Sequence, residues 1–117
     1  MAGPTRDISR VSDQEIVDAF HGEPLAVFVS HSKSRVILED LLEEASRLGI
    51  AFTVFFMDDG ASLLSDHEWL EALPKGSYAA CDLSARVRGI ETPNRIVPGG
   101  QYQNAIMIHD ASHVVSL

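Results

Sequence analysis

A single cysteine, Cys81, is the residue of this sequence best suited to nucleophilic chemistry. It stands where the apolar, strand-like run 77–81 meets a short segment, 82–88, that is typical of a helix. A thiol at the start of a helix lies near unpaired backbone N–H groups and the positive end of the helix dipole, and both favour the thiolate. The sequence therefore predicts a reactive cysteine at this position.

Further polar side chains follow each of the apolar runs 25–30, 50–57 and 77–81. They are Ser30, His31, Ser32, Lys33, Asp58, Asp59, Asp82, Ser84, Arg86 and Arg88. Because the carboxyl ends of parallel strands open on one edge of a sheet, we expect these side chains to converge near Cys81. Nearby cations would lower the pKa of the thiol, whereas the carboxylates would raise it, so the sequence leaves the net direction open.

The elements that position these residues are predicted from apolar runs and their boundaries. Strands are expected at 25–30, 50–57, 77–81 and 113–117, with a minimal strand at 96–97 inside the loop 91–99. Helices are expected at 13–21, 34–48, 65–73, 82–88 and 100–109. Near-continuously apolar strands that alternate with helices indicate a mostly parallel sheet of four to five strands. We therefore expect the α/β class, as a three-layer α/β/α sandwich.

Two helices have specific expectations attached to them. The apolar side chains at helical spacing in the segment 34–48 are Ile37, Leu41, Ala45 and Leu48. These are expected to face the core. Ser65 or Asp66, followed by Glu68, resembles a capping box and predicts the start of the next helix.

Composition limits the classes of function. A chain of 117 residues, 45% hydrophobic, predicts one domain, in which residues 1–24 form an N-terminal extension with one helix. A net charge of −8 with no basic block argues against nucleic acid as a partner. The longest apolar run, 54–57, is too short for a membrane span, and residues 1–14 lack the pattern of a signal peptide. A cytoplasmic protein without a membrane partner is expected.

Three motifs, taken in order, resemble the DsrE/TusD-type (DsrE/F/H) sulfur-relay family. They are Cys81 followed by Arg88-Gly89-Ile90, the strand end 54–60, and the terminal segment 109–117. The resemblance runs from about Leu25 to Leu117. It implies a domain that assembles into homo-oligomers such as trimers or hexamers, and that passes sulfane sulfur as a persulfide on Cys81 between donor and acceptor proteins. Relative to the shortest members, the chain has an N-terminal extension.

The resemblance places Cys81 at the sulfur-carrying position, and no cofactor is expected. From their charge and donor groups, the candidates to stabilise a persulfide are His31, Lys33, Ser84, Arg86 and Arg88, with Asp58 and Asp59 as secondary candidates. One cysteine suffices for a carrier, and a chain without a second cysteine cannot close an internal disulfide. Whether the protein acts as a sulfurtransferase enzyme is left open.

Other functions remain as alternatives. Some members of the family lack the cysteine and are structural subunits, so a non-catalytic role in an assembly is one of them. The loop Ser30–Ser34 lies where flavodoxin-like domains bind phosphate, which suggests a phosphate- or flavin-type binding module. His109 and His113 are four residues apart, but the predicted link between helix and strand separates them, so no metal site is expected.

Overall fold

A parallel five-stranded sheet forms the centre of the protein, for which the computed structural model describes residues 25–100 and 111–117. The strands are β2 (Leu25–Val29), β3 (Phe52–Phe56), β4 (Ser77–Cys81), β5 (Val97–Gly99) and β6 (His113–Ser116). Their order is β5-β4-β3-β2-β6, and every neighbouring pair is parallel. The predicted α/β class and the mostly parallel sheet are confirmed. The predicted helix 13–21 and residues 101–109 of the predicted helix 100–109 lie outside the described residues.

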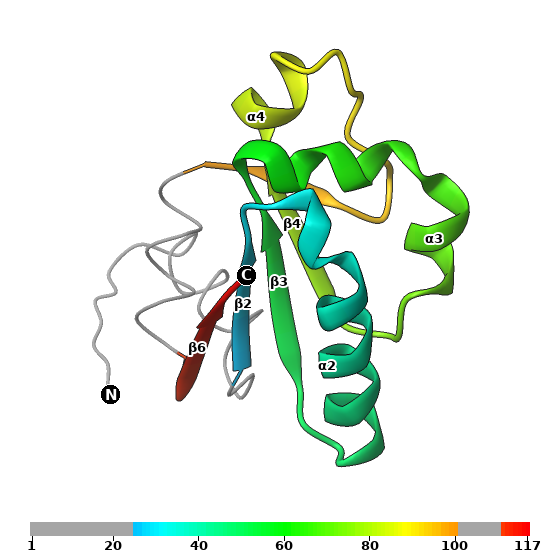
Figure 1. Ribbon diagram of the computed structural model, residues 1–117, viewed down its shortest axis with the longest axis vertical. Coiled ribbons are helices and arrows are strands. Elements are labelled where there is room, and N and C mark those ends of the chain that lie inside the picture. The colour runs from blue at the N-terminus through cyan, green and yellow to red at the C-terminus, as the bar shows by residue number, and fades with distance from the viewer. Residues whose placement is uncertain (1–24, 101–110) are drawn as a thin grey trace, which may run out of the picture.

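The helical elements within residues 25–100 connect the strands and pack mainly on one face of the sheet. They are η1 (Ser32–Ser34), α2 (Arg35–Arg47), η2 (Asp58–Ser65), α3 (His67–Ala72) and α4 (Asp82–Arg86), where η denotes a 3₁₀ helix. Figure 1 shows α2 and α3 on the same side of the sheet, while η2 and α4 lie at the end where the central strands finish. None of the helices in the described ranges combines the length and the apolar character that crossing a bilayer requires.

Buried apolar side chains form a cluster on each face of the sheet. Val27 and Val29 of β2 belong to the larger cluster, together with Leu38 and Leu42 of α2. The intervening residues of the strands form the second cluster, which consists of Ala26, Phe28, Phe55 and Ala79. Because successive strand residues point to opposite faces, a strand that is buried on both sides must be apolar throughout. This explains the continuous apolar runs from which the strands were predicted.

The face that α2 buries differs from the prediction. Ile37 and Leu48 were expected in the core, but they are 59% and 56% exposed, whereas Leu38 and Leu42 are fully buried. Ala45 is buried as predicted. Leu41, also expected in the core, is partly buried and packs against the larger apolar cluster. Arg35 and Glu39 hold another face of α2 against α3. The neighbouring face, which carries Leu38 and Leu42, is therefore turned to the sheet.

The segment between β3 and α3 is more ordered than expected. Asp58 and Asp59 were predicted to lie in a turn, and the structure instead begins a 3₁₀ helix there that continues to Ser65. Ala61 and Leu64 of this helix are fully buried. A 3₁₀ helix repeats every three residues, so its apolar positions give no 3.6-residue period to recognise. Of the two candidate caps, Asp66 is the N-cap of α3, and its carboxylate accepts a hydrogen bond from the Trp69 N–H.

Candidate functional site

Cys81 is the last residue of β4 and the N-cap of α4, as the sequence predicted. Its side chain is partly exposed and packs against the second apolar cluster, on the same side of β4 as Ala79. The thiol makes no capping hydrogen bond to α4, which has five residues. The structure thus places the sulfur beside apolar side chains rather than on the N–H groups of the helix. Met57 and Ala111 also pack against this cluster.

Asp59 connects the loop after β2 to the loop after β3. Its Oδ2 accepts hydrogen bonds from the Ser32 backbone N–H at 2.8 Å and from the Ser32 hydroxyl at 2.9 Å. These two bonds, the backbone one foremost, lower the pKa of Asp59, and the charges of Arg88 and His31 lower it further. Asp59 is therefore a carboxylate at neutral pH, and its role in this structure is to join η1 to η2.

Ser84 makes the corresponding connection from α4. Its side chain is buried, and its hydroxyl accepts a hydrogen bond from the Asp58 N–H at 2.9 Å. Asp58 has a left-handed backbone with φ of 50°, a conformation that aspartate tolerates better than most residues. Arg88 donates from Nη1 to the Ser84 carbonyl at 3.0 Å. The predicted convergence of the three loops at one sheet edge is therefore seen in η1, η2 and α4.

The remaining predicted site residues lie at this edge with different partners. Arg86 forms an ion pair with Asp82 through Nε at 3.0 Å and is otherwise well exposed. His31 is exposed, and its Nδ1 lies 3.2 Å from the Ser30 hydroxyl. Lys33, the middle residue of η1, is exposed. We call the region formed by η1, η2, Cys81 and α4 the carboxyl edge.

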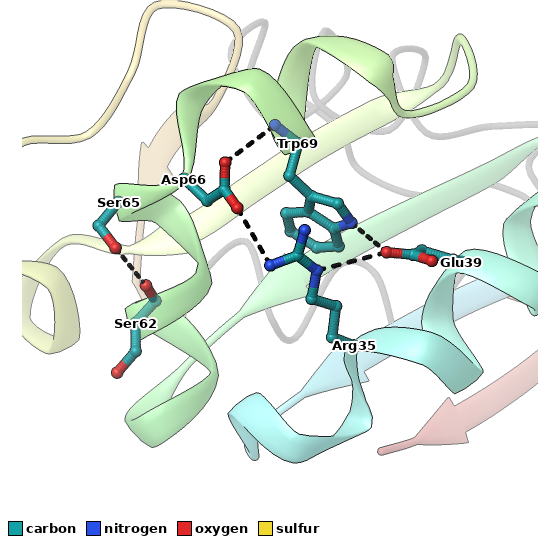
Figure 2. Close-up of polar contacts among 6 residues, drawn as sticks. All are labelled: Arg35, Glu39, Ser62, Ser65, Asp66 and Trp69. Carbon is teal, nitrogen blue, oxygen red and sulfur yellow. Dashed lines mark hydrogen bonds and ion pairs between the residues drawn. The ribbon is translucent and has the colours of Figure 1, made fainter.

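Two arginines that were not among the predicted site residues, Arg35 and Arg95, each make several polar contacts. Arg35 on α2 donates from Nε to Glu39 at 3.3 Å and from Nη1 to Asp66 at 3.0 Å. Its guanidinium also stacks over the ring of Trp69 at 4.9 Å, and the Trp69 indole N–H donates to Glu39 at 2.5 Å. Figure 2 shows these four side chains meeting between α2 and α3. We call them the α2–α3 clasp.

Arg95, the second of these arginines, secures the end of α3. Its guanidinium donates to the carbonyls of Leu70, Leu73 and Pro74, the latter two at 3.0 and 2.9 Å. It also stacks over the Tyr78 ring at 4.7 Å. A cleft of about 340 Å³ lies beside it, between α3 and the loop 91–95. A lone arginine that bonds to carbonyls leaves no motif in a sequence, so no signal was available to select Arg95.

Comparison with protein-family models, with curated proteins and with solved structures finds no match for this chain. Within residues 25–100 and 111–117, no group of three or more histidine, cysteine, aspartate or glutamate side chains is arranged to hold a metal ion. The functional argument therefore depends on the chemistry of the carboxyl edge and on the resemblance noted in the sequence.

Proposed function

We propose that this protein is a small sulfur carrier of the DsrE type that accepts sulfane sulfur on Cys81 and passes it to a partner protein. The observation that carries the proposal is the position of Cys81. The only cysteine of the chain is partly exposed at the carboxyl ends of parallel strands, where α/β proteins bind and transform their ligands. The sequence resemblance to the sulfur-relay family supports the same assignment.

The proposed transfer needs one cysteine and no external oxidant or reductant. The Cys81 thiolate attacks the outer sulfur of a donor persulfide, a new S–S bond forms, and the donor cysteine leaves as a thiolate. In the second step an acceptor thiolate attacks the outer sulfur of the Cys81 persulfide, and Cys81 leaves as the thiolate. With no second cysteine in the chain, the persulfide cannot collapse into an internal disulfide.

Two features of the carboxyl edge suit a persulfide on Cys81. Phe28 and Phe55 belong to the apolar cluster against which Cys81 packs, and sulfur makes favourable contacts with aromatic rings. A persulfide is also an anion, which guanidinium groups bind by charge-assisted hydrogen bonds. Arg86 commits Nε to Asp82, and Arg88 commits Nη1 to the Ser84 carbonyl, so each keeps further donors. We assign to these two arginines the stabilisation of the loaded sulfur.

The rival binding-module function is disfavoured by one contact. A phosphate in the loop Ser30–Ser34 would need the backbone N–H and the hydroxyl of Ser32, and both donate to the Asp59 carboxylate. A bound anion would have to displace a carboxylate that is itself charged. We therefore do not advance phosphate or flavin binding as a second function.

The resemblance further leads us to propose a homo-oligomer, a trimer or hexamer, that works in the cytoplasm with separate donor and acceptor proteins. Light scattering coupled to size exclusion tests the assembly directly. A mass of several subunits is expected, and a monomer at micromolar concentration would contradict this part while leaving the chemistry of Cys81 untouched.

The decisive experiment is the intact mass of reduced protein after exposure to inorganic polysulfide. The wild-type chain is expected to gain sulfur atoms that dithiothreitol removes, and Cys81→Ser is expected to gain none. Circular dichroism of both proteins establishes that they are folded. A folded wild-type chain that gains no sulfur would overturn the carrier function and favour a non-catalytic subunit.

A further inference from the structure

We draw no further inference here: the strongest candidate, the apolar pocket of about 370 Å³ that Leu25 of β2 lines together with Leu41 and Leu48 toward the C-terminal end of α2, carries nothing, because no contact of the described residues shows what covers it.

Discussion

The α2–α3 clasp and the carboxyl edge use charged and polar groups for different purposes. In the clasp, Arg35 and Asp66 form an ion pair, and Glu39 accepts hydrogen bonds from both Arg35 and Trp69. At the carboxyl edge the hydrogen bonds of Ser32 and Ser84 involve backbone N–H groups, which fixes the course of the loops. Positions rich in side-chain contacts therefore hold helices together, whereas the proposed chemistry lies where the loops are fixed and the side chains remain accessible.

Substitutions in the clasp and at the carboxyl edge should differ in their effect on stability. The ion pairs of the clasp are partly exposed, with side-chain exposures near 41%, so each contributes little to stability by itself. The backbone of the carboxyl edge passes close to the neighbouring strand, where no side chain fits. Steric changes there should have larger effects than the removal of any one polar contact in the clasp.

The largest effect is expected for Gly60→Ala. A Cβ at this position would lie 2.0 Å from the Val29 carbonyl oxygen and 2.6 Å from the carbonyl carbon, so the backbone of η2 or β2 must move. We expect a loss of about 3 kcal/mol in the free energy of unfolding, measured by urea denaturation. Gly100→Ala is the control, because no atom lies within 4 Å of its added Cβ. Equal stability of the two variants would show that η2 does not approach β2 this closely.

The next effect concerns Tyr78, whose ring lies between Phe52 and Arg95. Burial raises its pKa from the ordinary tyrosine value of 10.0 to about 12. Because the folded protein binds this proton more tightly than the unfolded chain, the stabilisation is complete below the unfolded pKa and is lost as the pH rises through the folded pKa. Wild type should therefore lose about 2 kcal/mol more than Tyr78→Phe between pH 9 and about 12.

Chemical denaturation of both proteins at several alkaline pH values measures this difference. The Phe variant also lacks the hydrogen bond from the Tyr78 hydroxyl to the Pro74 carbonyl at 2.5 Å, so it should be less stable at neutral pH. What tests the prediction is the change with pH. If the free energies of unfolding of the two proteins fell equally with rising pH, burial would not raise the pKa of Tyr78.

Much of the fold could be predicted because burial on both faces of a parallel sheet leaves continuous apolar runs. The direction of the Cys81 side chain could not be predicted. Alternation places it on the side of Ala79, but Ala80 is equally apolar, so the sequence does not show which side faces α2 and which faces the second cluster. The thiol consequently lies beside apolar side chains rather than on the α4 N–H groups.

The polar connections at the carboxyl edge were only partly predictable. Topology brings the loops after β2, β3 and β4 to one edge, and this much follows from parallel strands. The bond from Ser32 to Asp59 spans 27 residues of sequence and depends on the 3₁₀ path of η2, which leaves no recognisable period. In α2, either Ile37 and Leu41 or Leu38 and Leu42 could face the sheet, because both pairs have helical spacing. The contact of Arg35 with Asp66 orients the helix so that Leu38 and Leu42 are buried.

A smaller effect separates the two roles of Asp66 in the clasp. Its Oδ1 caps α3 through the Trp69 N–H at 3.1 Å, and its Oδ2 accepts from Arg35 at 3.0 Å. Asp66→Asn retains a capping oxygen and removes the charge, whereas Asp66→Ala removes both. We expect the alanine variant to be about 1 kcal/mol less stable than the asparagine variant in urea denaturation. Equal losses would mean that the ion pair, rather than the cap, is the contribution of Asp66.

The smallest effect is expected at Asp59, which belongs to the carboxyl edge. Its hydrogen bonds from Ser32 lower its pKa below the ordinary value of an aspartate, so the folded state favours the carboxylate. The resulting stabilisation is complete above the unfolded pKa and is lost as the pH falls through the folded pKa. Asp59→Asn should therefore be less stable than wild type at pH 7, and the gap should narrow progressively below about pH 4.

Urea denaturation from neutral to acidic pH measures this gap, with Asp40→Asn, at an exposed aspartate of α2, as the control. Asp59 is exposed, so the change is small, and salt should reduce the part that comes from Arg88 and His31 more than the part that comes from hydrogen bonds. If the difference in stability between wild type and Asp59→Asn stayed constant down to acidic pH, the charge of Asp59 would contribute nothing to stability. The loops of the carboxyl edge would then be joined by the Ser84 bond to Asp58 and by the apolar residues of η2, and the contrast with the clasp would lie in packing alone.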